Sequence, residues 1–378
     1  MENKIRFIAV AIFVTVLYTA GAQAQTPAAR SACDPPPPGT RASTNVLALQ
    51  VENDLFAGTD AQYTSGAKLT WVSPNLCTFD DAALSPWVRT SNRAVRDLVG
   101  WLHPQTASAL NMVVTLGQAM YTPADRDRTD VDPGDRPYAG WTYLGLGYNA
   151  RYDPARGGTA TLDTVEIDIG IVGPHSYAKE TQGVIHRMRG LRRFLGWDNQ
   201  LHDEPGLQIV VERKLRPPAL DWKAELGAEF IPHYGLSVGN VASYLNVGGE
   251  ARFGWRLPDD FGTSSIRPGG DNAAPRNAAT GEQFERLYNR RSFHFFASFD
   301  GRLVANNIFL DGNTFARSHA VKKKLLVGDI AYGWAYTWPP FNGLPSGKLA
   351  YSHYVQSREF DGEARNHGFG SISLSLEF

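Results

Sequence analysis

The C-terminal stretch from Gly368 to Phe378 reads GFGSISLSLEF. Its apolar residues alternate with serine and glutamate, so that Ile372, Leu374 and Leu376 share one face with the final phenylalanine. A period of two indicates a β-strand, and alternation of apolar with small or polar residues is typical of a barrel strand between lipid and a polar lumen. This stretch therefore favours an outer-membrane β-barrel over a soluble sandwich.

The same pattern recurs along the chain. It is clearest in residues 161–172, where Val165 and Ile167 oppose Glu166 and Asp168. We predict an all-β fold, a 12-stranded antiparallel transmembrane β-barrel. The candidate strands are 44–54, 64–72, 111–119, 141–151, 161–172, 206–216, 219–232, 243–256, 293–304, 324–337, 347–358 and 368–378.

The N-terminal residues precede the barrel. Residues 1–24 combine a basic start, an apolar core and a small-residue cleavage site, which predicts a secretory signal peptide. Residues 25–43 are rich in Pro and Ala and read as a lead-in, so the barrel domain is predicted to span 44–378. The net charge of -1 argues against nucleic acid as a partner. Cys33 and Cys77 lie in an exported chain, where a disulfide and two unpaired thiols both stay open.

An even strand number places both chain ends on the periplasmic side. Connections after odd-numbered strands then face the cell exterior, and the long insertions 73–110 and 257–292 face the periplasm. The first insertion carries an amphipathic pattern from Pro86 to Leu102, which predicts a helix, and the second reads as loop.

One exterior connection has helix chemistry. The segment from Val172 to Gly206 reads VGPHSYAKETQGVIHRMRGLRRFLGWDNQLHDEPG, and its spacing predicts a helix over residues 177–195. His186 lies nearly opposite the apolar face, between Gly183 and Gly190. Two glycines beside one histidine suggest that this face presses closely on another backbone; an ordinary surface helix is the alternative. The apolar face is Val184, Met188, Leu191 and Leu195.

Two polar residues at the tops of the first strands need an explanation. Asn53 shares a face with Leu49 and Val51, so it is expected to face outward where hydrocarbon meets headgroups. A polar group there is costly against lipid alone, and the helix bearing His186 is on the correct side to cover it. Thr64 is turned inward by simple pleating, so a bulge is needed to bring it to the same place.

The connection 120–140 holds five aspartates among arginines, which is commonly just a solvated surface. Its spacing does not match an EF-hand, but Ca²⁺ accepts carboxylates from separate loops, and arginines suit phosphates by their planar geometry. The candidate Ca²⁺ ligands are Asp125, Asp127, Asp130, Asp132 and Asp135, which Asp54, Asp203 and Glu204 could join in space. The arginines that could meet phosphates are Arg126, Arg128, Arg189, Arg192 and Arg193.

Several motifs in fixed order carry a family resemblance. The chain from about residue 44 onward resembles the lipid A 3'-O-deacylases of Gram-negative outer membranes. This resemblance implies a twelve-stranded barrel, a Ca²⁺-dependent esterase, and a site between the outer barrel wall and a helix of an extracellular loop. The motifs are VENDLF, QYTSGAKLTW, GDRPYAGWTYLG, GPHSYAKETQGVIHRMRG, GWDNQLHDEPGL and FLDGNTF.

The resemblance also implies catalytic residues. His186 corresponds to the general base, and Asn53 and Asp54 to the metal and oxyanion region. Thr64 corresponds to a further catalytic-site residue. The mechanism that we expect uses activated water rather than a serine nucleophile, although an acyl-enzyme route through Ser176 or Ser65 stays open.

For the substrate, the resemblance implies contacts from Arg128, to which we add Arg189. For the metal, Asp54 and Glu204 are the expected ligands. One position departs from the family pattern: Arg192 stands where a carboxylate follows the histidine by about two turns. This departure puts the activity and the metal site in question.

The expected function is hydrolysis of the 3'-linked acyloxyacyl chain of lipid A (LPS) by a monomer in the outer membrane. Three alternatives stay open. One is a passive barrel such as a porin or adhesin, another is a barrel phospholipase, and the third is an inactive member with the same fold.

Overall fold

The computed structural model describes residues 33–34, 44–54, 62–82, 84–95, 106–154, 158–263 and 291–378. The predicted signal peptide, 1–24, lies outside these residues, and so does most of the predicted lead-in, 25–43. The predicted insertion 257–292 is described only at its two ends. Cys33 and Cys77 form a disulfide, with 4.4 Å between their Cα atoms.

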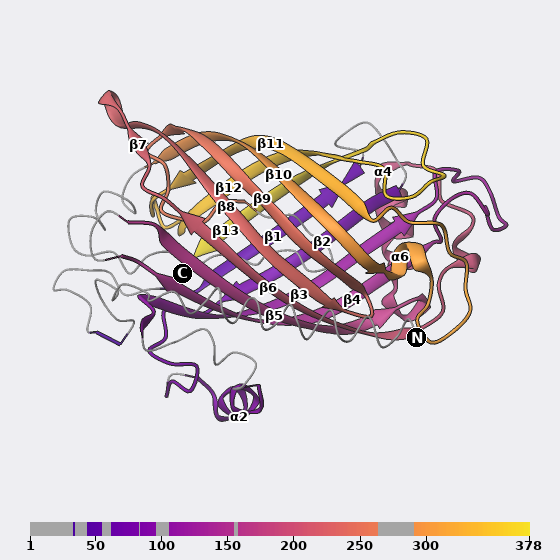
Figure 1. Cartoon of the computed structure of the whole chain (residues 1–378), viewed down its shortest axis with the longest axis horizontal. Helices are drawn as coiled ribbons and strands as arrows, with labels where there is room; N and C mark the ends of the chain where they lie inside the picture. Colours follow the sequence, from indigo (N-terminus) through magenta and orange to yellow (C-terminus); the bar gives the residue numbers. More distant parts are fainter. Residues whose placement is uncertain are drawn as a thin grey trace.

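Twelve antiparallel strands form a closed barrel, which confirms the predicted fold class. Strand order runs from β6 back to β1, then from β13 back to β8, and the barrel closes where β6 pairs with β8 (Figure 1). The strands are β1 (Val46–Asn53), β2 (Gln62–Val72), β3 (Ala109–Thr122), β4 (Ala139–Tyr152), β5 (Ala160–Val172), β6 (Glu204–Arg216), β8 (Leu226–Gly239), β9 (Ala242–Trp255), β10 (Ser292–Asn307), β11 (Leu326–Trp338), β12 (Ser346–Gln356) and β13 (His367–Glu377).

One predicted strand was misplaced along the chain. Residues 219–232 do not form a single strand: β7 (Leu220–Asp221) makes a small hairpin outside the barrel, and β8 starts only at Leu226. Pro232 lies inside β8, although proline is uncommon in sheet interiors. It lies one residue before the ladder between β8 and β6, which begins at His233. The expected outer loop 233–242 is therefore mostly strand.

Apolar side chains cover the outside of the barrel. Four exposed residues on neighbouring strands pair in register and form what we call the apolar row. Because adjacent residues of a strand point to opposite faces, residues two apart from this row also face outward. The apolar row consists of Leu116 (β3), Leu144 (β4), Ile169 (β5) and Leu207 (β6).

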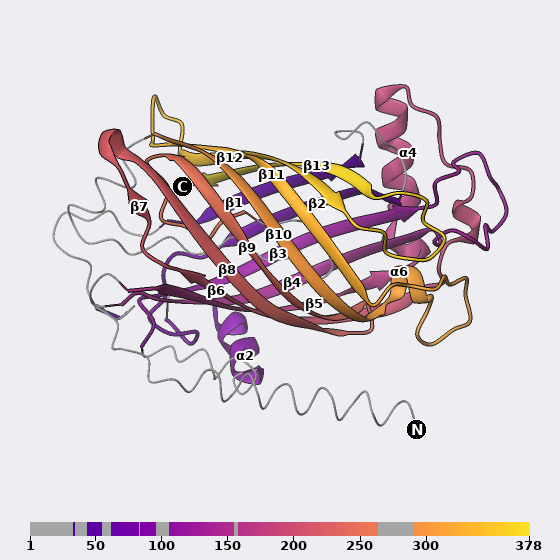
Figure 2. The same cartoon turned by 45° about the horizontal axis from the view of Figure 1, so that its top comes forward.

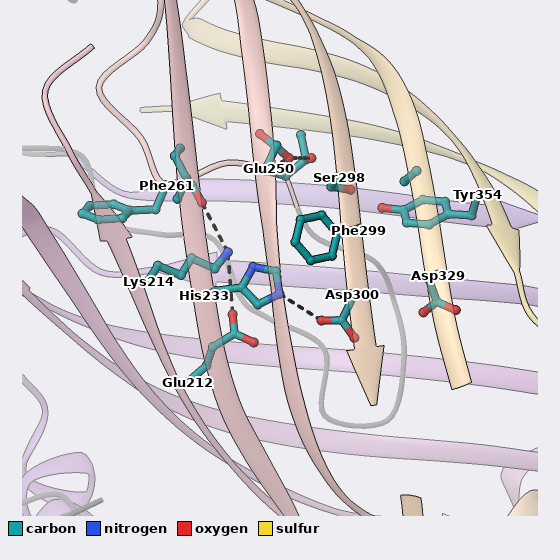
Figure 3. A pocket seen from close by; sticks show the side chains of 13 residues that line it. Glu212, Lys214, His233, Glu250, Phe261, Ser298, Phe299, Asp300, Asp329 and Tyr354 are labelled. Atoms are coloured by element: carbon teal, nitrogen blue, oxygen red, sulfur yellow. Dashed lines mark hydrogen bonds and ion pairs between the residues drawn. The ribbon is translucent and has the colours of Figure 1, made fainter. Parts of the chain in front are cut away.

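Ionic side chains occupy the lumen. His233 Nε2 lies 2.9 Å from Asp300 Oδ2, and Lys214 lies between Glu212 and the main-chain carbonyl of Phe261 (Figure 3). A cavity of about 50 Å³ remains among these side chains, which is room for a small number of water molecules. The described lumen is thus filled with charge pairs.

The insertion after β2 packs on the outer wall toward the barrel end that holds the start of β1 and the C-terminus. Its helix α2 (Pro86–Ala94) lies over β3 and β4, where Tyr148 donates a 2.8 Å hydrogen bond to Asn92 Oδ1. This confirms a helix in the insertion, although the described helix ends earlier than Leu102. Among the described residues, no helix is both long and apolar enough to cross a membrane.

A buried arginine joins two loops at the other end of the barrel. Arg136 pairs with Glu359, and its guanidinium lies 5.2 Å from the ring centre of Tyr121 and 5.7 Å from that of Phe360. Glu363 is buried in the same loop as Glu359 and accepts a 2.6 Å hydrogen bond from the main-chain N–H of Glu359. Burial raises the pKa of Glu363 from 4.5 to about 7.

This raised pKa predicts a pH dependence of stability. The folded protein keeps a proton on Glu363 that the unfolded chain has released, so the group's contribution is complete below about pH 4.5 and lost as the pH rises to about 7. We expect Glu363→Gln, which keeps an acceptor but does not ionise, to flatten the fall in Tm between about pH 5 and pH 8. Thermal unfolding followed by circular dichroism measures this; parallel curves for variant and parent would contradict it.

Candidate functional site

The segment between β5 and β6 contains the predicted helix, in a shorter form. A 3₁₀ turn, η4 (Pro174–Ser176), precedes α4 (Ala178–Arg189). Gly190 ends the helix with a φ of 67°, a left-handed conformation that glycine adopts without steric cost. The helix therefore stops well before Leu195, where the sequence had extended it.

The start of α4 is fixed to the outer wall by hydrogen bonds and close packing. Gln118 Nε2 and Thr142 Oγ1 each donate a 2.7 Å hydrogen bond to the main-chain carbonyl of Ser176. A Cβ on Gly140 of β4 would lie 2.2 Å from both Ala178 Cβ and Ser176 Oγ. Only glycine allows this approach.

The expected role of the helix glycines is therefore wrong. A Cβ on Gly183 would meet only a flexible arginine tip at 3.7 Å, and one on Gly190 would meet nothing within 4 Å. The close backbone approach that they suggested occurs instead at Gly140, on the strand. The predicted contact face is nevertheless the one that packs, because Gln182 and His186 are buried.

Four residues form a second row on the outer wall, above the apolar row. Asn53 pairs with Ser65, Ser65 with Met120, and Met120 with Gly140. Asn53 follows the exposed Val51 by two residues and is itself buried, which agrees with the prediction that it faces outward under a cover. We call this set, from β1 to β4, the site row.

The helix follows the site row across the wall. The turn η4 contacts β5 and β4, and α4 contacts β4 and β3, so the chain proceeds toward β2 and β1. Figure 2 shows α4 running across the long axis of the barrel. His186 lies eight residues after Ala178, about 12 Å along a helix. Three strand spacings from Gly140 to Asn53 amount to about 14 Å. The histidine is thus carried toward the Asn53 end of the site row.

The imidazole of His186 is held in one tautomer. It is 3% exposed, and its Nδ1 lies 2.6 Å from the main-chain oxygen of Arg192. A carbonyl only accepts, so Nδ1 carries the proton and Nε2 is the basic nitrogen of the neutral ring. Phe194 packs edge-on against the imidazole ring, with 5.8 Å between the two ring centres.

This geometry accounts for the unusual Arg192. Its main chain positions His186, while its exposed side chain pairs with Asp127 at 2.7 Å. The contact with His186 therefore does not depend on which side chain occupies position 192.

Gln182 is a buried neighbour that sequence reasoning missed. Trp197 Nε1 donates a 2.7 Å hydrogen bond to Gln182 Oε1, which fixes the orientation of the amide. Within the described part of the chain, Gln182 Nε2 has no hydrogen-bond acceptor. It lies one helical turn before His186, so a buried donor and a base share one face. The spacing of four residues between Gln182 and His186 was the sequence signal that could have identified Gln182.

The other predicted site residues lie in two regions: Asp54 and Thr64 are at the tops of β1 and β2, and Glu204 is at the start of β6. Asp54 is fully buried beside Asn53. A β-bulge between Tyr63 and Ser65 lies at Thr64, as the pleating argument required; the Thr64 side chain is outside the described part. Glu204 lies on β6, where it accepts hydrogen bonds from two other rim loops. Among the described residues, no cluster of three or more His, Cys, Asp or Glu is placed to hold a metal ion.

The two predicted substrate-binding arginines differ in their surroundings. Arg128 forms ion pairs with Asp130 at 3.1 Å and Asp132 at 3.2 Å. Hydrogen bonding from Arg128 lowers the pKa of Asp130 below its ordinary value. Arg189 is exposed at the end of α4.

The fold and the site together define an outer-membrane barrel with a loop helix on its outer wall, and this helix carries a buried histidine. The chain belongs to the family of the outer membrane protein LpxR, whose model matches residues 7–378. The protein is therefore located in the bacterial outer membrane, with α4 at the end opposite the N-terminal start of β1.

A solved structure of this family has the same fold. LpxR from Salmonella typhimurium is 18% identical, with 88% of this chain and 100% of that chain covered and a TM-score of 0.62. The β domain of the Bordetella autotransporter BrkA is 10% identical, covers 89% and 100%, and has a TM-score of 0.46. No curated protein matches the chain.

Proposed function

We propose that this protein is a lipid A 3'-O-deacylase, which hydrolyses the ester of the 3'-linked acyloxyacyl chain in the outer leaflet. The observation that carries the proposal is His186: a buried imidazole with Nε2 as its basic nitrogen, on a helix whose first residue packs on Gly140 of the outer wall. Lipid A presents its esters where acyl chains meet headgroups, the level at which outward Asn53 lies.

His186 supplies the base. Its Nε2 takes a proton from a water molecule, which attacks the ester carbonyl, and the hydrogen bond from Nδ1 to the carbonyl of Arg192 supports the positive charge that develops on the ring. Such proton transfer contributes about 10²–10⁴-fold to a rate. The leaving alkoxide then recovers the proton.

Donors for the developing oxyanion come from the same face. Gln182 Nε2 is a buried amide donor fixed by Trp197, and the Asn53 amide lies at the end of the site row. Preorganised donors of this kind stabilise an oxyanion without reorganisation.

Calcium is part of the proposal. The buried carboxylate of Asp54 and the amide oxygen of Asn53 are donors of the kind that Ca²⁺ prefers, together with main-chain carbonyls. Both oxygens of Glu204 already accept hydrogen bonds from Asn240, Asn313 and Thr314, so we leave it out of the set. Bound Ca²⁺ supplies polarisation of an ester carbonyl.

We expect deacylation by the purified protein to stop in EGTA and to return when Ca²⁺ is added in excess. Added Mg²⁺ is the control, because it demands a smaller octahedral site. Release of the acyloxyacyl chain, followed by mass spectrometry, measures the effect. Full activity in EGTA would remove the metal from the mechanism.

Two features oppose the alternative functions. Ion pairs fill the described lumen beside β6 and β8 and leave a cavity of only about 50 Å³ there, which does not favour a passive channel, and the candidate site lies on the outer wall rather than in the lumen. Exposed Arg189, with Arg128 at the rim, suits a phosphorylated sugar headgroup. Offering the purified protein lipid A and a glycerophospholipid separately tests this choice; fatty acid released only from the glycerophospholipid would overturn it.

A further inference from the structure

The face of α4 opposite its buried side carries exposed apolar side chains next to Glu180 and Arg187. Gln182 and His186 are buried on the side of the helix where Ala178 packs on Gly140 of the wall, and the side chains roughly opposite to them are exposed. We call these the outer stripe. It consists of Tyr177 at 61%, Val184 at 44% and Met188 at 82% exposure. Apolar residues so exposed on one face of a helix mark an interaction surface.

The helix starts at the upper edge of the lipid-facing surface. Ser176 is hydrogen-bonded to Gln118 and Thr142, which stand two residues above Leu116 and Leu144 of the apolar row. Two strand residues amount to about 7 Å along the strand. The outer stripe is therefore continuous with the apolar wall of the barrel.

The orientation of α4 matches this level. Figure 2 shows the helix crossing the long axis of the barrel, so it lies along the plane of the membrane. A helix that lies in this plane buries its apolar face at the boundary between headgroups and acyl chains and carries basic residues beside it. Arg187, exposed on the last turn of α4 next to Val184 and Met188, supplies that basic edge.

We propose that α4 is an interfacial helix whose outer stripe inserts among the acyl chains of the outer leaflet. Its basic edge then meets the anionic phosphates of the lipid headgroups. The helix has two working faces: His186 faces the wall, and Met188 faces the lipid. If the proposed deacylase function holds, the stripe keeps acyl chains adjacent to the gap where hydrolysis occurs.

An environment-sensitive label tests the insertion without an activity assay. The fluorophore NBD is attached at Met188→Cys in the full chain, whose native cysteines are paired, and the protein is placed in vesicles of phosphatidylethanolamine and lipid A. We expect a blue-shifted emission and quenching by brominated acyl chains, like those of a label at Leu144→Cys on the apolar row. A label at Ala316→Cys, exposed on a rim loop, gives the water-exposed reference. Emission from position 188 equal to that from position 316 would overturn the proposal.

A second variant tests the consequence for catalysis. Met188→Asp is expected to slow deacylation of lipid A in vesicles by about tenfold, which corresponds to about 1.4 kcal/mol, and to leave deacylation in detergent micelles unchanged. Ala316→Asp is the matched control. Equal loss in vesicles and micelles, or no loss in either, would overturn the catalytic consequence. An inactive parent would refute the deacylase function and leave the fluorescence result standing.

Discussion

The variant His186→Ala is expected to lose lipid A deacylation by about 10²–10⁴-fold while the barrel stays folded. The imidazole is the only basic group that the structure buries on the wall-facing side of α4 among the described residues, and its loss removes the proton acceptor for water. Most of the loss is expected in kcat, because the substrate's contacts with arginines and lipid are unchanged. Single-turnover release of the acyloxyacyl chain, followed by mass spectrometry, measures it.

Two matched controls sharpen this result. His175 belongs to the same segment, but it is exposed and pairs with Asp203 at 2.6 Å, so His175→Ala should keep parental activity. Arg192→Ala keeps the main-chain carbonyl that holds His186 and should change the rate by less than about tenfold. Heat-modifiable migration on gels checks that each barrel is folded. Parental activity of His186→Ala would exclude this histidine as the base.

The second large effect is expected from Gly140→Val, a change on the strand rather than on the helix. Its side chain would overlap Ala178 and Ser176, whose Cβ and Oγ lie 2.2 Å from the first added carbon. Such overpacking costs about 1–3 kcal/mol and is relieved by lifting α4 off the wall. A displacement of about 1 Å at the reacting groups can lower a rate by about 10²-fold.

The readout is deacylation together with hydrogen exchange along α4. We expect activity to fall and exchange in residues 178–189 to rise, with the strands protected as in the parent. Gly301→Ala, on β10, is the control, since the added carbon would meet only a main-chain oxygen at 3.7 Å. Full activity of Gly140→Val with unchanged exchange would show that the docking contact does not position the site.

Much of this architecture was predictable because strand alternation is a local property. The period of two located eleven of the twelve strands closely, and the outward direction of Asn53 followed from its neighbours on β1. β8 was misplaced because residues 219–232 include both the small hairpin strand β7 and the first half of β8, which the local pattern does not separate.

The site was predictable in part. The buried face of α4 was identified, but its docking point was not, since Gly140 is explained only by what packs against it. The link between His186 and position 192 was also hidden, because it runs through a main-chain carbonyl that no residue type reports. The roles of Asn53, Asp54, Thr64 and Arg128 stay predictions.

The site row lies on the outer wall beneath α4, at the side of the leaflet, and for the proposed deacylase this has a kinetic meaning. A lipid reaches such a place by sliding sideways in two dimensions and leaves in the same manner, so it never has to dissolve. Encounter frequency is then set by the fluidity of the leaflet, and anything that stiffens the packing of its neighbours slows turnover without touching the protein.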